Sequence, residues 1–325
     1  MKRTLTQPFP SIIRFDLIVA DQITFPLPLL KRFCSPKILF YCHFPDKLLV
    51  QQQQQRGFLH RSLYRRVFDW AEEVCLARGA DRVVVNSKFT QVAFMNAFPS
   101  LKVPTVLYPG VRIPSKSNGE ITTARKEKTF LSLNRFERKK DIELALEALA
   151  LMRNQAKLIV AGGFDTGNRE NVEYLAELEQ LCERLNLSHS RSTSDALKRP
   201  ERVVFAPSIQ ESLKESLLNT CHPALLYTPQ NEHFGIVPVE AMSRGSLVLA
   251  MDSGGLKETV VPGRTGWLCR NRDAKEMAAL MDRAMELNSQ KWQEMSRFAA
   301  EQVREKFSLE AFSRNLNSLV QEMIK

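Results

Sequence analysis

The amino-acid sequence predicts an α/β fold in which each half of the chain builds a parallel, doubly wound sheet. Short apolar runs alternate with amphipathic helical patterns from about residue 37 onward, as expected when helices connect parallel strands. A polar, basic stretch at 110–128 separates two series of such runs. The 325 residues, 44% of them hydrophobic, suffice for two domains with cores of their own.

The first half contains three buried strands and two helices. Strands are expected at 37–42, 81–86 and 104–109, and helices at 58–79 and 87–98, the second of them capped by Ser87. No glycine-rich turn follows an opening strand in this half. We therefore predict a partial N-terminal Rossmann-like domain that, with the linker, covers residues 1–127.

The second half is more complete, and we predict a full Rossmann-like domain over residues 128–325. Helices are expected through 141–152 and 170–187, and further helices near 272–287 and 291–323 close the chain. The polar segment 188–202 is expected to be a surface loop. Strands are expected at 129–133, 157–163, 202–207, 223–229 and 246–252.

The charge and the cysteines narrow the class of partner. A net charge of +10 favours nucleic acid, an anionic membrane surface or a phosphorylated small molecule. We expect no nucleic-acid binding, because the basic residues are dispersed and lack interleaved aromatic residues. The six cysteines show no metal-ligand spacing, so no metal site is expected. No stretch approaches the roughly 18 apolar residues of a membrane-spanning helix.

Glu232 and Glu240 lie on either side of an almost uncharged run. Eight residues of helix span about 12 Å, whereas the two carboxylates of a glycosidase lie about 5 to 9.5 Å apart. The pair therefore does not suit an acid and a base at one bond. We expect each glutamate to bind a different part of one long ligand.

Pro238 predicts a helix start between these two glutamates. Proline is tolerated only in the first turn of a helix, so the helix should begin near Val237. Its free N–H groups and the turn at Gly235 then form a phosphate site. Carboxylate, phosphate site and carboxylate match the layout of a nucleotide sugar. The alternative is an ordinary loop with two surface glutamates.

The turn NRFERKKD (134–141) follows an expected strand and precedes a helix. Arg135 and Lys140 stand where the carboxyl ends of parallel strands open a ligand crevice, and they can neutralise a diphosphate. The alternative is a solvated charge run in which Asp141 caps the next helix.

Other candidate site residues follow expected strands. Gly162 and Gly163, and likewise Ser253 and Gly254, form glycine turns that allow a ligand to approach the backbone. His43 follows the strand at 37–42, at the crevice edge of its sheet. The alternative for His43 is a hydrogen-bonded structural histidine.

EHFGIVPVE, NRFERKKD and VAGG together resemble the retaining glycosyltransferases of the GT4 family, which have the GT-B architecture of two Rossmann-like domains. Further motifs over about residues 37–323 are similar to the dolichol-pathway α-1,3/α-1,6-mannosyltransferase family. These motifs are KILFYCHFPDKLL, VVVNSKFT, VLYPGV, LALEAL, YTPQNEHFGIVPVEAM and SGGLKETV.

The resemblance implies a role for each candidate residue. Glu232 would contact the donor hexose, Glu240 the ribose, and His43 would lie near the reacting sugar. The catalytic set is His43, Glu232, Arg135 and Lys140, of which the last two hold the diphosphate. The donor-binding set is Phe234, Gly235, Ile236, Glu240, Gly162, Gly163, Ser253 and Gly254.

The resemblance also implies the reaction. Mannose would pass from GDP-mannose to a dolichol-linked oligosaccharide, with retention of configuration, no cofactor and no side-chain nucleophile. The site of action would be the cytosolic face of the endoplasmic reticulum membrane, in association with other mannosyltransferases of the pathway. Two alternatives stay open: a GT-B enzyme with another nucleotide sugar, and a chain that binds donor without turnover.

The sequence departs from the family pattern in two places. The family begins with a strand and a GGAE-like loop, for which this chain has MKRTLTQPFPSIIRFD instead. We therefore expect an N-terminally truncated form whose first sheet has exposed core faces. The region 188–217 also fits the pattern less well.

Overall fold

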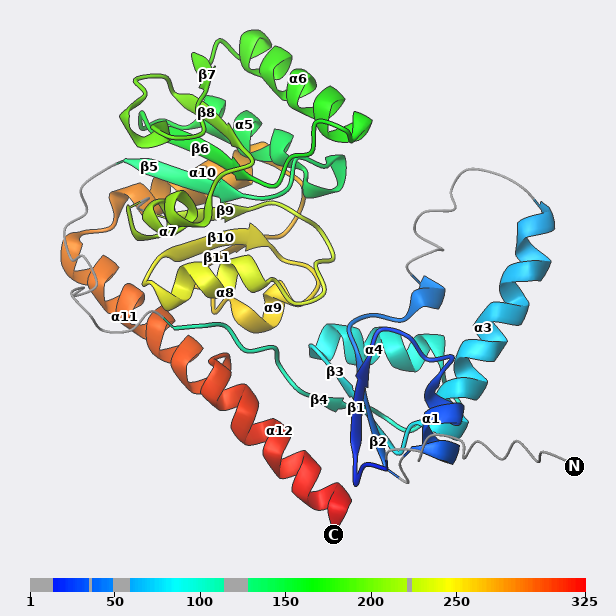
Figure 1. Cartoon of the computed structure of the whole chain (residues 1–325). Coiled ribbons are helices and arrows are strands. Elements are labelled where there is room, and N and C mark those ends of the chain that lie inside the picture. The colour runs from blue at the N-terminus through cyan, green and yellow to red at the C-terminus, as the bar shows by residue number, and fades with distance from the viewer. Residues whose placement is uncertain (1–13, 35–36, 49–58, 114–127, 221–223) are drawn as a thin grey trace, which may run out of the picture. The chain divides into compact units, whose positions relative to one another are not determined.

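The computed structural model describes residues 14–34, 37–48, 59–113, 128–220 and 224–325, which form two compact units (Figure 1). The first unit comprises Met1–Tyr108 and Phe312–Lys325, and the second comprises Pro109–Ala311. In the described part of the chain, no helix is long and apolar enough to cross a membrane.

The first unit is built on a parallel four-stranded sheet of order β1-β2-β3-β4. The three predicted strands and both predicted helices are confirmed, and the Ser87 hydroxyl caps α4 by accepting the N–H of Thr90. β1 was not predicted, because it is a four-residue edge strand whose short apolar run at 17–20 lies between the charged residues Asp16 and Asp21. The elements are β1 (Ile18–Asp21), α1 (Leu27–Phe33), β2 (Ile38–Cys42), α3 (Leu59–Gly79), β3 (Arg82–Val85), α4 (Lys88–Ala97) and β4 (Thr105–Val106).

Both faces of the central strands in this sheet are covered. Phe40 in β2 packs into a core with residues of α1, α3 and α4, whereas Leu39 and Tyr41 face α12 (Leu309–Ile324). The expected exposed core faces are therefore not found at β2 and β3. In β1, at the edge of the sheet, Val19 is half exposed.

The end of the chain differs from the expected arrangement in two ways. The expected helix at 291–323 is interrupted, because Val111 exchanges backbone hydrogen bonds with Phe307 and Leu309 and so ends α11 (Ser289–Lys306). The helix beyond this break, α12, was expected to belong to the second domain. Its segment from Phe312 instead groups with the first unit, because its apolar side chains complete that unit's core.

The packing of α12 predicts a stability effect in the first unit. We expect Leu319→Ala to lower the free energy of unfolding by about 2–5 kcal/mol, because Leu319 is buried against β2 and β3. Urea denaturation, with hydrogen exchange of the β2 amides, measures this loss. Asn317→Ala, at an exposed position of the same helix, is the control. Equal losses in the two variants would contradict the assignment of α12 to this core.

The second unit is built on a parallel seven-stranded sheet of order β11-β10-β9-β5-β6-β8-β7. Its strands are β5 (Thr129–Leu133), β6 (Lys157–Gly162), β7 (His189–Arg191), β8 (Val203–Pro207), β9 (Ala224–Tyr227), β10 (Leu247–Met251) and β11 (Gly266–Cys269). Its helical segments are η1 (Arg138–Lys140), α5 (Ile142–Leu151), α6 (Arg169–Arg184), η2 (Ala196–Lys198), α7 (Glu211–Thr220), α8 (Ile236–Ser243), α9 (Leu256–Thr259), α10 (Ala274–Glu286) and α11.

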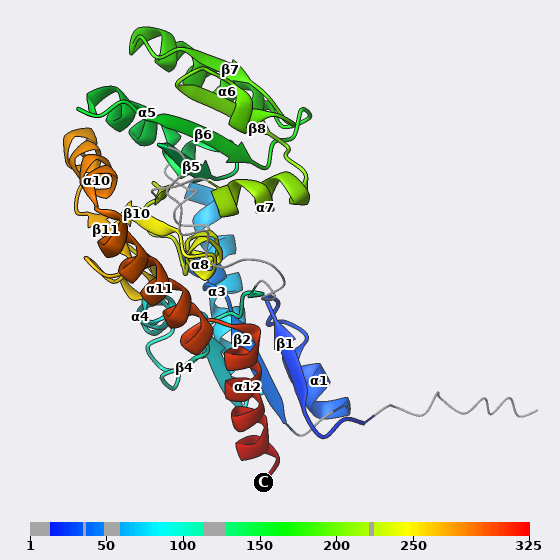
Figure 2. The same cartoon turned by 90° about the vertical axis from the view of Figure 1, so that its left-hand side faces the viewer.

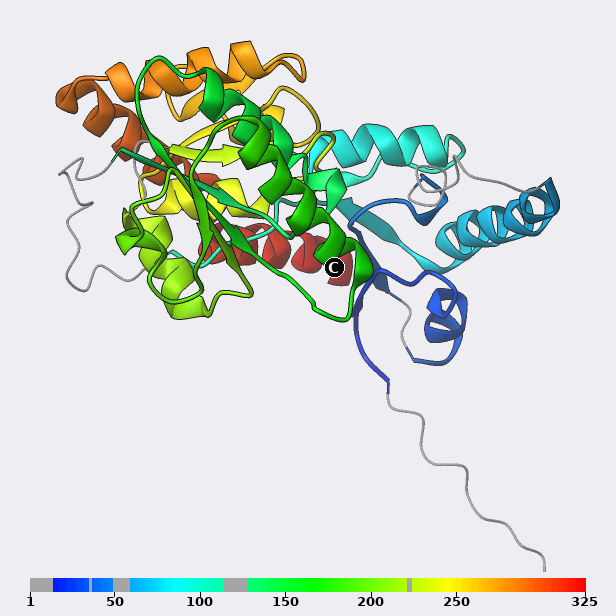
Figure 3. The same cartoon turned by 90° about the horizontal axis from the view of Figure 1, so that it is seen from above.

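Helices cover both faces of this sheet. α5, α6 and α10 share one core with alternate residues of the strands, while α8 packs against β9 and β10 on the other side. Figures 2 and 3 show α10 and α7 on opposite sides of the strands. The strand order reverses at β5, which lies between β9 and β6, and such a reversal is where ligands bind in doubly wound sheets.

The region 188–217 contains structure that the sequence did not predict. The segment 188–202, expected to be a loop, includes β7 and η2, and α7 follows β8. β7 was missed because His-Ser-Arg is polar and only β8 pairs with it. β11 was also missed, since it has four residues and begins with a glycine.

Candidate functional site

A salt bridge joins the two chain segments that leave the sheet at its point of reversal. Lys140, in the turn after β5, donates from Nζ to Glu232 Oε2 at 2.8 Å, and Glu232 lies in the loop after β9. The side chains of Lys140 and Glu232 are only 14% and 24% exposed. The pair is therefore partly shielded from water, which strengthens its mutual attraction.

Tyr227 completes this pair. Its hydroxyl donates to the same oxygen, Glu232 Oε2, at 2.9 Å, and its ring lies 6.0 Å from Lys140 Nζ. Burial alone would raise the pKa of Glu232, but the Lys140 ammonium and the hydrogen bonds from Lys140 and Tyr227 hold it below its ordinary value. Burial raises the pKa of Tyr227 well above its ordinary value. Glu232 is thus an ionised acceptor and Tyr227 a protonated donor.

The loop after β10 supports the backbone of Glu232. Gly255 donates its N–H to the carbonyl of Glu232 at 2.7 Å, and the Ser253 hydroxyl accepts the N–H of Asn231 at 2.9 Å. At Gly254, where φ is +62°, a Cβ atom would lie 2.3 Å from the Glu232 carbonyl oxygen. Ser253 and Gly254, predicted as donor contacts, therefore hold the loop that carries Glu232.

The start of α8 agrees closely with the prediction from Pro238. The helix begins at Ile236, one residue before the expected position, and Gly235 precedes it with a φ of +88°. The Phe234 side chain is buried against Phe307, with ring centroids 5.5 Å apart, so at this position only the backbone can face a ligand. The N–H groups in the first turn of a helix have no acceptor within it.

A cavity of about 290 Å³ lies at the carboxyl ends of β5, β6 and β9. Three cationic side chains line it, from the turn after β5 and from α7: Arg135, Lys140 and Lys214. Lys214 also contacts both carboxylate oxygens of Glu240 at 3.2 Å. Each of the two predicted glutamates is thus paired with a lysine of the same cavity. The remaining lining residues are Leu133, Asn134, Gly162, Gly163, Ser208, Ile209, Tyr227 and Val237.

The predicted glycines Gly162 and Gly163 lie beside the basic turn. At Gly162, φ is +145° and a Cβ atom would lie 2.1 Å from the carbonyl oxygen of Asn134, so only glycine allows this approach. Arg135 is exposed and pairs with Glu137 at 3.0 Å. Asp141 occupies the N-cap position of α5, as the alternative expected, but its carboxylate pairs with Arg272 at 2.8 Å and makes no capping bond.

His43 lies in the first unit, at the carboxyl edge of its sheet. Its Nε2 is 3.6 Å from Asp21 Oδ2, at the end of the neighbouring strand β1, and its ring lies 4.7 Å from that of Tyr41. Asn86 donates to the carbonyl oxygen of His43 at 2.9 Å, which fixes the backbone there. His43 is half exposed, so its imidazole is accessible to a substrate.

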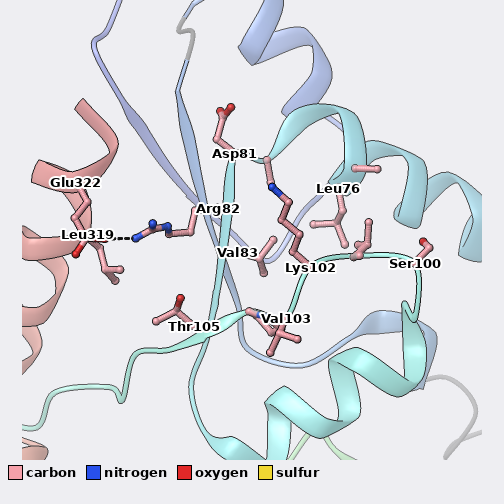
Figure 4. A pocket seen from close by; sticks show the side chains of 14 residues that line it. Leu76, Asp81, Arg82, Val83, Ser100, Lys102, Val103, Thr105, Leu319 and Glu322 are labelled. Carbon is pink, nitrogen blue, oxygen red and sulfur yellow. Dashed lines mark hydrogen bonds and ion pairs between the residues drawn. The ribbon is translucent and has the colours of Figure 1, made fainter. Parts of the chain in front are cut away.

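The first unit also has a larger cavity, of about 770 Å³, at the opposite edge of its sheet (Figure 4). It lies where β3 and β4 begin, between the end of α3 and α12. Two of its charged residues already pair with other residues of the protein: Arg82 with Glu322 at 2.7 Å, and Asp81 with Lys31 at 2.6 Å. We therefore place the site at the smaller, cationic cavity.

Three residues that contact predicted site residues were not predicted from the sequence. Tyr227 contacts Glu232, Lys214 contacts Glu240, and Asp21 lies beside His43. Tyr227 ends β9 and was interpreted as part of a buried strand, although a polar side chain at the end of a strand is a usable signal. Lys214 lies in a helix that was not predicted. Asp21 belongs to β1, which was also not predicted.

Comparisons with known proteins identify relatives of this chain. The family described as "Glycosyl transferases group 1" matches residues 116–302. The alpha-1,3/1,6-mannosyltransferase ALG2 of Kluyveromyces lactis is 38% identical over 97% of this chain and 67% of its own length. Schizosaccharomyces pombe alg2 is 39% identical over 97% of this chain and 64% of its own length. Dictyostelium discoideum ALG2 is 38% identical over 95% of this chain and 76% of its own length. The chain thus spans about two thirds of these relatives' length.

Solved structures share the fold. Anabaena HepE in complex with UDP and glucose has a TM-score of 0.70 at 23% identity and covers 94% of this chain and 78% of its own. Sucrose-phosphate synthase from Thermosynechococcus elongatus has a TM-score of 0.72 at 24% identity, and the match covers 95% of this chain and 73% of the synthase. These likenesses show the GT-B fold, in which each of two domains contains a parallel sheet. Sequence identity over nearly the whole chain goes further: it belongs to the group 1 glycosyltransferases and, among them, to the alpha-1,3/1,6-mannosyltransferase family.

Proposed function

We propose that this chain transfers mannose from GDP-mannose to a dolichol-linked oligosaccharide, making α-1,3 and α-1,6 linkages. The observation that carries the proposal is the Lys140–Glu232 pair at the reversal of the second sheet, beside a cavity lined by three cations. A sugar diphosphate needs cations for its phosphates and an ionised acceptor for its hydroxyl groups. The site offers both within one small volume.

The charges suit departure of a nucleoside diphosphate. Negative charge develops on the leaving diphosphate as the glycosidic bond breaks, and preorganised cations stabilise that charge more in the transition state than in the ground state. Lys140 and Arg135 supply the positive charge, and the first turn of α8 supplies N–H groups. Glu232 would accept from the mannose hydroxyl groups, and Glu240 from the ribose.

Turnover assays with purified chain test this function. We expect transfer from GDP-mannose to a lipid-linked mannosyl acceptor and no transfer from UDP-glucose. UDP-sugars are the second candidate, because HepE, which shares the fold, has been solved with UDP-glucose. Transfer from a UDP-sugar alone would reject GDP-mannose as the donor. Tight GDP-mannose binding without turnover would support a chain that binds donor and does not transfer it.

We further propose that the chain works at the cytosolic surface of the endoplasmic reticulum membrane, where its acceptor lipid would be embedded. Exposed apolar side chains before and within α1, including Ile23, Phe25, Leu29 and Phe33, support contact with lipid. Flotation with vesicles of endoplasmic reticulum lipid composition tests this proposal. A chain that stays at the bottom of the gradient would contradict it.

A further inference from the structure

We propose that Tyr227 is a positioning residue for the donor sugar, because it fixes one carboxylate oxygen of Glu232 and leaves the other to accept from a sugar hydroxyl. The proposal rests on the function proposed above. Both side-chain contacts of Glu232 in the described structure end on Oε2: the Tyr227 hydroxyl at 2.9 Å and Lys140 Nζ at 2.8 Å. Oε1 is the oxygen that remains for a ligand.

The end of β9 holds both donors in place. Tyr227 is the last residue of β9, and its side chain is almost fully buried. The next residue, Thr228, donates its hydroxyl to the carbonyl oxygen of Lys140 at 2.8 Å. Tyr227, the last residue of β9, and Thr228, directly after the strand, thus contact Glu232 and the lysine that pairs with it. A strand end is more rigid than a loop, so it suits the task of orienting a catalytic carboxylate.

The direction of the tyrosine bond is set by the chemistry of the pair. A buried tyrosine hydroxyl needs a hydrogen-bond partner, and here it faces an ionised carboxylate, which can only accept. Tyr227 is therefore the donor of this bond, and the charged Glu232 is its acceptor. Without this bond, Lys140 alone would restrain the carboxylate, and Glu232 could rotate about its side-chain bonds toward the lysine.

The inference makes a specific prediction for Tyr227→Phe. The variant keeps the ring and loses only the hydroxyl, so Lys140 stays in place and the diphosphate site is unchanged. We expect affinity for GDP-mannose to fall about tenfold, because one hydrogen bond to a charged group is lost, while affinity for GDP changes less than about twofold. Isothermal titration calorimetry with each ligand measures both. A merely structural role would weaken the two ligands together.

Tyr174→Phe is the matched control. Tyr174 in α6 is also buried and does not line the cavity. Its hydroxyl also donates to a glutamate, Glu143, and it accepts the N–H of Ile142 at 2.9 Å. We expect this variant to lose stability without changing affinity for either ligand. Equal affinities of Tyr227→Phe and wild type for GDP-mannose would overturn the inference.

The titration of Glu232 tests the same bond without a ligand. The groups acting on its carboxylate are Lys140, Tyr227 and His233. Since the tyrosine bond lowers the pKa of Glu232, its removal should raise that pKa, which NMR of the labelled carboxyl group can follow. GDP-mannose binding should accordingly be lost at a higher pH on acidification. An unchanged Glu232 pKa in Tyr227→Phe would overturn the inference, whereas a wild-type chain that binds no nucleotide sugar would overturn the proposed function.

Discussion

Replacing Lys140 by alanine is expected to lower the rate of mannose transfer by about 100- to 1000-fold, the usual cost of removing a group that stabilises transition-state charge. Each of the three cations that line the cavity pairs with a carboxylate. Of the three, Lys140 has the least exposed side chain. Its loss removes positive charge from the diphosphate site and leaves Glu232 partly buried beside Tyr227 alone. Steady-state transfer from GDP-mannose, with calorimetric titration of GDP, measures the two effects.

The neighbouring lysine provides the control for Lys140→Ala. Lys139 is 65% exposed and pairs with Glu137 at 2.9 Å, so Lys139→Ala removes the same charge from the same turn without touching Glu232. Glu137, which is only 13% exposed, keeps Arg135 as a partner at 3.0 Å in this variant, and we expect transfer within about twofold of wild type. Similar rates in the two variants would show that the pair with Glu232 has no part in transfer.

The removal of Lys140 should also change how the stability of the fold depends on pH. The pKa of Glu232 lies below its ordinary value because Lys140 and Tyr227 outweigh the effect of burial. A carboxyl group with a lowered folded-state pKa stabilises the fold above its unfolded-state pKa, and this stability is lost as pH falls through the folded-state pKa. Without Lys140 the pKa of Glu232 rises. On acidification, the contribution of ionised Glu232 to the stability of the fold is therefore lost at a higher pH than in the wild type.

Gly254→Ala is expected to have the second large effect, through the loop that carries Glu232. The new Cβ would lie 2.3 Å from the Glu232 carbonyl oxygen and 2.8 Å from its nitrogen, and φ at this position is +62°. The loop must move, which breaks the bond from Gly255 N–H to Glu232. We expect a loss of about 2–5 kcal/mol in the free energy of unfolding, from left-handed strain and overpacking together, and at least about tenfold weaker GDP-mannose binding.

Gly263→Ala separates these two causes. Gly263 also has a positive φ, of +76°, but a Cβ there would meet nothing within 4 Å. Its replacement should cost only the left-handed strain of about 1–2 kcal/mol and leave donor affinity unchanged. Urea denaturation and calorimetry of both variants make the comparison. If the two variants lose the same free energy of unfolding and both keep the wild-type affinity for GDP-mannose, the close approach at Gly254 does not position Glu232.

Much of the fold follows from local sequence patterns. The mostly apolar run at 129–133, bounded by polar residues, predicted β5 because a strand between two layers of helices is largely apolar on both faces. Pro238 placed the start of α8 within one residue, since its missing N–H is tolerated only in a first turn. β7 could not be predicted in this way, because its three residues are polar.

The candidate site was predicted less completely than the fold. Glu232 and Glu240 were chosen for their spacing around an almost uncharged run, and Arg135 and Lys140 for their places after a strand. The structure brings each glutamate to a lysine of one cavity. The lysine for Glu240 was not foreseen, because Lys214 lies on a helix without a clear amphipathic signal in the sequence. His43 stays a prediction in the first unit, where Asp21 and Tyr41 surround it.

The sequence by itself determined most of the longer strands and helices, where α8 begins and which charged residues stand at strand ends, because these depend on neighbours a few positions away. Only the tertiary structure decided that β5 lies beside β9, and so that Lys140 meets Glu232 across 92 residues of chain. It also decided that Tyr227 shares that contact and that α12 packs on the first sheet. Strand order and helix docking are set by how the apolar faces of distant segments fit together, which no local pattern records.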